Sequence, residues 1–255
     1  MTYLSNLFGL EGKTAIITGA SRGLGRAAAL ALNEAGGNVV LFGRDARKLE
    51  ETLSLLSEPE RAVMIEGNVN SEAARKKTIT ETLQDFGTID ILINNAGIIR
   101  RSPAMEFSKQ DWNDTIETDL TSVFHWSQDV AAEMMKSGGG KIINVASILS
   151  FSGGMNVVAY AAAKGGVAQL TKALANDWAK YHINVNAMAP GYFITDATDA
   201  LRKNSERSQS IISRIPAGRF GEPDELAGAF IFLSSHASDY MDGHILTVDG
   251  GFNSY

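Results

Sequence analysis

Short apolar runs alternate along this chain with longer stretches whose apolar residues have helical spacing. The short runs are bounded by Gly, Asn, Asp or Ser and predict strands at residues 14–18, 38–42, 62–66, 89–94, 141–146, 184–189 and 245–248. The helical spacing predicts helices at residues 24–35, 72–86, 110–136, 160–181 and 222–235. Strands that are apolar throughout are typical of a sheet buried on both faces. The alternation therefore predicts an α/β fold, in which a doubly wound parallel sheet of about seven strands forms a three-layer αβα sandwich with helices.

No linker rich in Pro, Ser or charge interrupts this alternation, so the 255 residues predict a single domain. The polar stretch at residues 195–214 is the clearest excursion from the scaffold, and we interpret it as a lid over the substrate. Ligands of such folds gather at the carboxyl ends of the strands, and the site is expected there.

Composition argues against several classes of function. The formal net charge of −6 gives no basic surface for a nucleic-acid backbone. The absence of Cys excludes disulfides, thiolate metal sites and cysteine nucleophiles. No metal site is predicted, because the histidines are far apart in sequence, at His125, His182, His236 and His244. The chain lacks a recognisable signal peptide and a bilayer-spanning apolar run, so we expect a cytoplasmic protein without a membrane partner.

A glycine-rich segment follows the first predicted strand and opens an Ala- and Leu-rich helix. It reads Thr18-Gly19-Ala20-Ser21-Arg22-Gly23-Leu24-Gly25. Glycines allow a tight turn and close approach of the backbone to a pyrophosphate, and a helix N-terminus offers unpaired N–H groups. The segment predicts a dinucleotide site, and the alternative is a glycine turn that binds nothing.

The end of the second predicted strand indicates which dinucleotide is preferred. The chain reads Phe42-Gly43-Arg44 where an NAD-selective protein would place a carboxylate on the ribose hydroxyls. Arg44 and Arg22 can present two guanidinium groups to a 2′-phosphate, which favours NADP. NAD remains the alternative, since both arginines can also be solvated loop charges.

Three side chains predict hydride-transfer chemistry. Ser147 ends a predicted strand, and Tyr160 and Lys164 lie four residues apart on one face of a predicted helix. Reduction of a carbonyl by hydride creates an alkoxide that needs a proton, and a phenol can supply it or take it back. We expect the Lys164 ammonium to lower the pKa of Tyr160 from about 10, and Ser147 to orient the substrate oxygen. A solvated Tyr–Lys pair on a helix surface is the alternative.

These motifs occur in an order that resembles the short-chain dehydrogenase/reductase family over nearly the whole chain. The pattern T-G-x-x-x-G-x-G, the segment Asn94-Asn95-Ala96-Gly97, Ser147 and Tyr-x-x-x-Lys carry the resemblance. It implies a Rossmann-type oxidoreductase and a homotetramer. For the cofactor it implies contacts from Asn68 and Val69 at the adenine, from Asn95, Ala96 and Gly97 along its length, from Tyr160 and Lys164 at the nicotinamide ribose, and from Pro190, Gly191, Ile194 and Thr195 at the carboxamide.

One position departs from the family pattern. The chain reads Glu117-Thr118-Asp119-Leu120 where the family often has N-x-N-L, and the second Asn of that motif maintains a proton relay beside the lysine. Asp119 is therefore a candidate relay residue that can bias Lys164 toward its charged state. The alternative is an unrelated, solvated carboxylate.

The segment after Gly97 suggests a substrate class. Arg100 and Arg101 follow it into the expected substrate mouth and can bind a carboxylate, unless they form a solvated basic turn. With residues 148–154 and 248–251 they resemble sugar-acid dehydrogenases of the gluconate and 2-dehydro-3-deoxygluconate type, which implies a hydroxylated carboxylic acid as substrate. A 3-oxoacyl-carrier-protein reductase is the alternative enzyme. A non-catalytic NADP-binding sensor or interaction protein is the alternative of another class.

Overall fold

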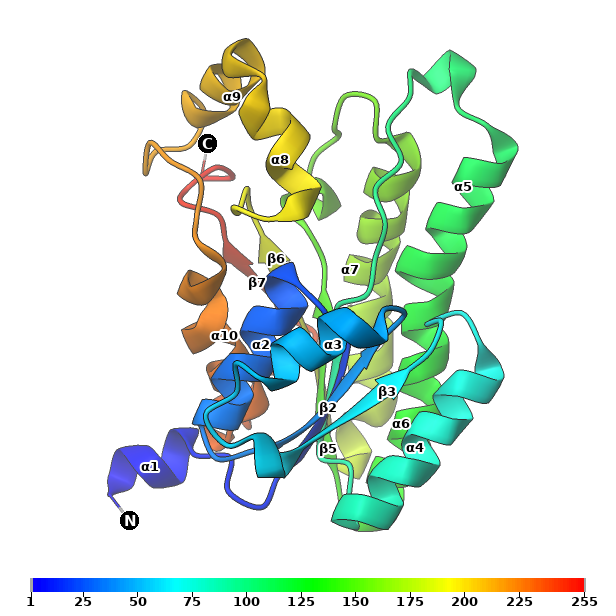
Figure 1. The fold of residues 1–255 in the computed structure, drawn as a ribbon, viewed down its shortest axis with the longest axis vertical. Coiled ribbons are helices and arrows are strands. Elements are labelled where there is room, and N and C mark those ends of the chain that lie inside the picture. Colours follow the sequence, from blue (N-terminus) through cyan, green and yellow to red (C-terminus); the bar gives the residue numbers. More distant parts are fainter. Residues whose placement is uncertain (1, 255) are drawn as a thin grey trace.

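A parallel sheet of seven strands forms the centre of the protein in the computed structural model, which describes residues 2–254. The strands are ordered β3-β2-β1-β4-β5-β6-β7, and helices cover both faces of the sheet (Figure 1). The predicted doubly wound α/β fold is confirmed. The strand bounds are β1 Thr14–Thr18, β2 Asn38–Gly43, β3 Ala62–Glu66, β4 Ile91–Asn94, β5 Gly140–Val145, β6 Ile183–Pro190 and β7 Ile245–Val248.

The direction of winding reverses beside β1. The chain runs outward from β1 to β2 and β3, then returns to add β4 on the other side of β1. Ile17 of β1 is accordingly in register with Leu41 of β2 and with Ile93 of β4. In open parallel sheets such a switch point opens a crevice at the carboxyl ends of the strands, where ligands bind.

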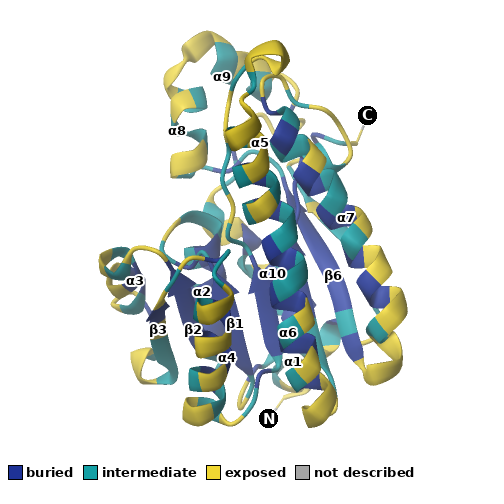
Figure 2. Ribbon diagram, turned by 90° about the vertical axis from the view of Figure 1, so that its right-hand side faces the viewer, coloured by how far each residue is buried: buried dark blue, intermediate teal, exposed yellow. Residues whose placement is uncertain are grey.

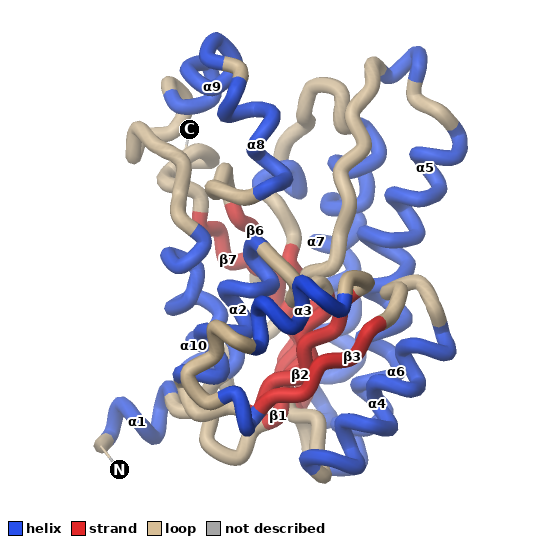
Figure 3. Tube along the Cα trace, viewed as in Figure 1, coloured by secondary structure: helices blue, strands red, loops and turns tan. Residues whose placement is uncertain are grey.

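The helices divide between the two faces of the sheet (Figure 3). One face carries α2 Gly23–Glu34, α3 Ala46–Leu53 and α10 Ala227–Ser234. The other carries α4 Glu72–Phe86, α6 Ser122–Ser137 and α7 Val158–Trp178. A short helix, α1 Tyr3–Phe8, lies at the amino end. A single π-helical turn, Glu117–Thr121, joins α5 Lys109–Ile116 to α6, where the sequence predicted one uninterrupted helix.

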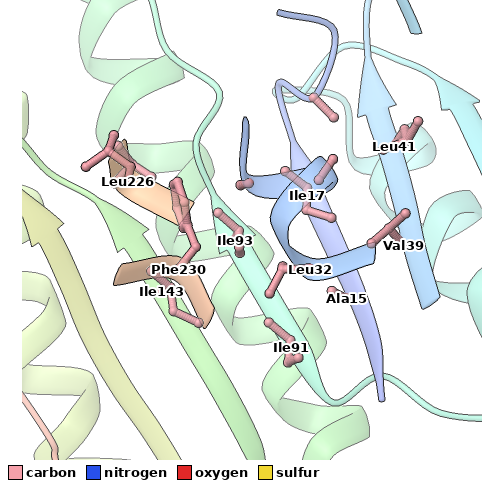
Figure 4. Close-up of a cluster of buried hydrophobic side chains, with 14 of the residues drawn as sticks. Ala15, Ile17, Leu32, Val39, Leu41, Ile91, Ile93, Ile143, Leu226 and Phe230 are labelled. Atoms are coloured by element: carbon pink, nitrogen blue, oxygen red, sulfur yellow. The ribbon is translucent and has the colours of Figure 1, made fainter. Parts of the chain in front are cut away.

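Alternate residues of the buried strands point to opposite faces of the sheet and build two separate cores. Figure 4 shows the core under α2 and α10, with residues from four strands and both helices. Ile16, Val40 and Leu92 point the other way and pack with Trp126 of α6. Figure 2 shows the central strands as buried, and β1 and β4 are buried at every residue. Full burial of one such side chain stabilises the fold by about 1.5–3 kcal/mol, so these two layers hold the strand ends in place.

The polar stretch at residues 195–214 folds into two short helices, α8 Asp196–Lys203 and α9 Ser205–Ile212. We call residues 195–214 the two-helix segment. It stands above the carboxyl ends of the strands (Figure 1). Among residues 2–254, no helix is both long and apolar enough to cross a lipid bilayer.

Candidate active site

The glycine turn between β1 and α2 has a backbone that only glycine adopts without strain. Gly19 and Gly23 have φ of +70° and +55°, in the left-handed region. A Cβ on Gly19 would lie 2.9 Å from the Ala96 Cα, and a Cβ on Gly25 would collide with the Gly19 carbonyl oxygen. The turn is thus closely packed against the backbone of Ala96. The unpaired N–H groups at the N-terminus of α2 form an anion-binding site, which fits the pyrophosphate of a dinucleotide.

The segment after β4 braces this turn. The Asn95 side-chain amide donates to the carbonyl oxygens of Thr18 and Gly19, at 3.0 and 3.1 Å. The backbone N–H groups of Asn95 and Ala96 both donate to the Thr18 hydroxyl. The ends of β1 and β4 are therefore locked together, and Asn95, Ala96 and Gly97 lie directly beside the glycine turn, where the resemblance placed the cofactor.

A second brace was not predicted from the sequence. Arg26 donates from Nη2 to the Ser21 carbonyl oxygen at 2.7 Å and from Nε to the Thr52 hydroxyl at 3.0 Å. Thr52 in turn donates to the Ala20 carbonyl oxygen. These bonds tie the glycine turn to α3. An arginine in the first turn of a helix gives no sequence signal for such a role, because its side-chain partner, Thr52, belongs to α3, which was itself not predicted.

The two arginines proposed for the 2′-phosphate differ in their surroundings. A Cβ on Gly43 would lie 3.7 Å from the Ser21 Cβ, so the end of β2 meets the glycine turn, and exposed Arg44 follows directly. Arg22 is exposed and pairs with Asp196 of the two-helix segment at 3.0 Å. An ion pair this exposed is worth less than about 1 kcal/mol, so Arg22 can exchange its partner for a phosphate.

The segments expected at the two ends of the dinucleotide are both positioned by internal hydrogen bonds. Val69 is buried, while exposed Asn68 accepts the Asn70 N–H at its side-chain oxygen, and its side-chain amide donates no hydrogen bond among residues 2–254. Pro190 ends β6, and the Gly191 N–H donates to Val248.

Beyond Gly191 the chain passes over the glycine turn. The Thr195 methyl group would be 3.5 Å from a Cβ on Gly23. The Ile194 N–H donates to the Gly221 carbonyl oxygen at 2.8 Å, so of its backbone groups the carbonyl is the one left for a carboxamide.

Ser147 and Tyr160 line one cavity of about 160 Å³. Ser147 follows the end of β5 and Tyr160 lies in the first turn of α7. The Ser147 Oγ accepts the Leu149 N–H at 3.1 Å, which leaves its own O–H to donate toward a ligand. Ser150 links the two elements, because its hydroxyl bonds to the Ser147 N–H and to the Lys164 carbonyl oxygen.

Lys164 lies one helical turn after Tyr160 and is 3% exposed. Its Nζ is 5.6 Å from the centre of the Tyr160 ring and donates to the Val145 carbonyl oxygen at 2.7 Å. Burial lowers the pKa of Lys164, and the nearby Asp119 carboxylate partly opposes this. The sequence predicts that Ser147, Tyr160 and Lys164 lie close together. In the structure they do, because the end of β5 and the start of α7 meet.

Asp119 lies in the π-helical turn and is fully buried. Its Oδ1 accepts the Ile98 N–H at 2.8 Å, and its Oδ2 is 3.9 Å from the Lys164 Nζ with no hydrogen-bond partner among residues 2–254. Burial raises the pKa of Asp119 to about 6, although the Lys164 charge and the Ile98 N–H act to lower it. The alternative of a solvated, unrelated carboxylate is therefore wrong.

The electrostatic environment of Tyr160 differs from the sequence expectation. Burial raises the pKa of the Tyr160 phenol, and the negative charge of Asp119 raises it further, while the Ser147 hydroxyl and Arg101 lower it. The expectation that Lys164 lowers this pKa is wrong for the protein's own groups, because the lysine ammonium is engaged by Val145 and Asp119 instead.

The two predicted substrate arginines point to different places. Arg101 lines the cavity, and its Nη2 donates to the Ala197 carbonyl oxygen at 3.2 Å. Arg100 is not part of the lining, and its Nε lies 3.4 Å from Asp111 Oδ1. A residue the sequence did not single out, Arg207 of α9, lines the same cavity. The position of Arg207 could not be predicted from the sequence, because a polar stretch does not indicate which of its side chains point toward the site.

Comparison with known proteins extends the similarity over the whole chain. A family profile described as Enoyl-(Acyl carrier protein) reductase matches residues 19–253. The chain is 45% identical over 249 residues to a 2-dehydro-3-deoxy-D-gluconate 5-dehydrogenase of Dickeya dadantii, covering 97% of this chain and 98% of the relative. It is 42% identical over 247 residues to a gluconate 5-dehydrogenase of Gluconobacter oxydans, covering 96% of each chain.

A solved structure agrees in fold. The crystal structure of a gluconate 5-dehydrogenase from Burkholderia cenocepacia in complex with NADP and tartrate superposes with a TM-score of 0.94 and is 40% identical in sequence. The match covers 99% of this chain and 100% of that one. The resemblance expected from the sequence motifs is confirmed, and it includes the two-helix segment as well as the nucleotide end.

Proposed function

This chain belongs to the short-chain dehydrogenase/reductase family, and on that premise we propose that it is an NADP-dependent dehydrogenase of a sugar acid related to gluconate. It moves a hydride between nicotinamide and a secondary alcohol or ketone. The observation that carries the proposal is that Ser147 and Tyr160 line one cavity with Lys164 behind them, beside a glycine turn built for a dinucleotide.

The cofactor site fits NADP. The bound cofactor supplies the carbon that gives or takes the hydride and, when oxidised, a positive charge beside the phenol. The N-terminus of α2 receives the pyrophosphate, and Arg44 with Arg22 receives the 2′-phosphate. Relatives support this choice, since the Burkholderia enzyme was crystallised with NADP. The proposed cofactor contacts are Gly19, Ser21, Arg22, Gly23, Leu24, Gly25, Arg44, Asn68, Val69, Asn95, Ala96, Gly97, Tyr160, Lys164, Pro190, Gly191, Ile194 and Thr195.

Tyr160 carries the proton. Because burial raises its pKa, the phenol is protonated at neutral pH and is ready to donate to the oxygen of a ketone as that oxygen gains charge. In the direction of oxidation the same phenolic oxygen takes the proton from the alcohol. Ser147 donates a hydrogen bond to the reacting oxygen and fixes its orientation.

Lys164 and Asp119 form a buried pair of opposite charge behind the phenol. The carboxylate charge raises the pKa of Tyr160, so the pair as a whole does not favour the phenolate. Asp119 faces Lys164 at 3.9 Å and favours the protonated lysine. We assign Asp119 the relay position that the family fills with Asn, with the difference that a carboxyl group can itself hold a proton.

The substrate class follows from the relatives and from charge. The relatives act on gluconate or 2-dehydro-3-deoxygluconate, and one was crystallised with tartrate, also a hydroxy acid. Arg101 places a guanidinium group in the wall of the cavity that contains Tyr160. A carboxylate bound there would leave the hydroxyl-bearing carbons of the acid for Ser147 and Tyr160.

Assembly and location belong to the proposal as well. We propose a homotetramer, as the family resemblance implies, and we expect it to work in the cytoplasm. Trp112 on α5 supports an interface, because it is 42% exposed and apolar, and aromatic side chains are enriched where subunits meet.

A substrate panel tests the proposed function. Purified enzyme is assayed with D-gluconate, 5-dehydro-D-gluconate, 2-dehydro-3-deoxy-D-gluconate, neutral polyols and a 3-oxoacyl thioester, each with NADP(H) and NAD(H). We expect kcat/KM to be highest for a sugar acid with the phosphorylated cofactor. Preference for the thioester would instead favour the acyl-carrier-protein reductase, and cofactor binding without any turnover would favour the sensor.

A further inference from the structure

The cavity lined by Ser147 and Tyr160 carries an excess of positive charge. Of the described residues that line it, the charged ones are Arg101 and Arg207, and none is Asp or Glu. The remaining lining is apolar or carries neutral hydroxyl groups, as at Thr195 and Thr198. Cationic groups in a largely apolar wall are stabilised when an anion joins them. The residues that line the cavity therefore favour an anionic ligand.

Arg207 is held in this wall by the helix on which it lies. The Asn204 side chain accepts the Arg207 N–H at 3.0 Å and fixes the start of α9. Ile211 is four residues further on, so it shares a face of α9 with Arg207. Ile211 packs against the cluster of Ile148, Ile215 and Phe252, and Ile148 directly follows Ser147. The face that carries Arg207 is thus turned toward the reaction site.

The Arg207 guanidinium lacks a partner within the described chain. Its Nε is buried and forms no hydrogen bond, and none of the ion pairs found among residues 2–254 includes it. Arg202, on the preceding helix, also has a buried Nε without a hydrogen bond, but its Nη2 reaches Asp199 at 3.4 Å, and Arg219 reaches Glu225 at 2.6 Å. A buried donor without an acceptor costs free energy, and a carboxylate can accept two bonds from one guanidinium.

From this geometry we propose that Arg207 binds the carboxylate of the substrate and determines specificity for sugar acids over neutral polyols. The inference rests on the proposed dehydrogenase function and adds a residue to it. Arg101, bonded to Ala197 of α8, is the second cation at the same wall. Because Arg207 belongs to α9, the bound carboxylate also holds the two-helix segment over the reacting carbon.

Kinetics with a matched pair of substrates test this assignment. D-gluconate and its neutral amide, D-gluconamide, differ in the group that Arg207 would bind. In Arg207→Gln the ratio of kcat/KM for gluconate over gluconamide should fall about 10- to 100-fold, mostly through KM, and Arg207→Lys should lie between it and the wild type. Arg202→Gln removes the same charge from the same segment outside the cavity, and it should keep the wild-type ratio. An unchanged ratio in Arg207→Gln overturns the assignment.

A binding measurement separates this inference from the proposed function. D-gluconate is titrated calorimetrically into wild type, Arg207→Gln and Arg202→Gln, each saturated with NADPH so that no oxidation occurs. A 10-fold or greater rise of Kd in Arg207→Gln alone supports the carboxylate site even if the wild type oxidises no sugar acid. Equal Kd values, or no gluconate binding by the wild type, overturn it even if gluconate is oxidised. Melting temperatures within a few degrees of the wild type show that the variants are folded.

Discussion

Asp119 shows how one residue can change the electrostatics of a site that is otherwise typical of its family. The carboxyl group is fully buried, and its pKa is raised from the usual 3.8 to about 6, chiefly by burial. The folded chain therefore holds this proton more tightly than the unfolded chain. The resulting stabilisation is complete below about pH 3.8 and is lost as the pH rises through about 6.

The variant Asp119→Asn tests this pH dependence. Asn is neutral at every pH, so the melting temperature of the variant relative to the wild type should rise by about 2–8 °C between pH 5 and pH 8. Thermal unfolding by circular dichroism in matched buffers measures the difference. A difference that stays constant with pH would mean that Asp119 does not titrate in this window.

Arg44 carries the prediction on cofactor choice. Loss of its guanidinium in Arg44→Ala should lower the ratio of kcat/KM with NADP over that with NAD by about 10-fold or more, because a charged hydrogen bond to the 2′-phosphate is removed. Arg47→Ala is the control, since Arg47 is 89% exposed on α3 and its nearest carboxylate lies 3.9 Å away. An unchanged preference in Arg44→Ala would remove this residue from the cofactor site.

The positions of Ser147, Tyr160 and Lys164 could be predicted from the sequence, because spacing determines them. The spacing of Tyr160 and Lys164 places both on one helical face, and the end of a predicted strand places Ser147. The pKa of Tyr160 could not be predicted, because it depends on burial and on Asp119, which lies far away in the sequence. No local pattern contains such information.

At the level of elements, strands were easier to predict than short helices. Buried strands are marked by apolar runs, and all of the predicted ones are present in the sheet. The helices α1, α3, α8 and α9 were not predicted, since each has eight residues or fewer and offers little periodicity. The π-helical turn was also missed, although it is what turns Asp119 inward. The extra residue of a π-helical turn does not change the spacing of apolar residues enough to be recognised in the sequence.

The glycine turn is the element most directly open to test. In Gly19→Ala the new Cβ would meet the Ala96 backbone at 2.9 Å at a φ of +70°, so the turn must open and NADP affinity should fall at least about 30-fold. Gly12→Ala is the matched control, because Gly12 has a φ of +76° and nothing within 4 Å of the added Cβ. Titration followed by NADPH fluorescence measures both. Similar affinities in the two variants would show that close packing at Gly19 is not needed for binding.

At the scale of the whole molecule, the winding of the sheet brings distant segments to one edge. The ends of β1, β4, β5 and β6 deliver the glycine turn, the Asn95 brace, Ser147 and the Thr195 segment respectively. This convergence could be predicted from the strand–helix alternation alone, since parallel strands end at the same side. The position of Arg207 could not, because it depends on how the two-helix segment packs back onto that edge.

The proposed assembly is also a property of the whole molecule. A homotetramer of this 27.3 kDa chain would have four times that mass in light scattering after size exclusion. Replacement of the exposed Trp112 by Glu should shift the population toward smaller species, because a charge would be buried in the contact. A wild-type protein that elutes as a monomer at micromolar concentration would contradict the proposed assembly.

Turnover by Tyr160→Phe tests whether the Tyr160 phenol carries the proton in the reaction. This variant removes a single oxygen atom, so kcat should fall about 10²- to 10⁴-fold, while the variant still binds NADP and its melting temperature stays close to the wild type. Tyr181→Phe, at a half-exposed tyrosine beyond the far end of α7, should keep full activity. Turnover by Tyr160→Phe within a few-fold of the wild type would show that the proton passes through another group.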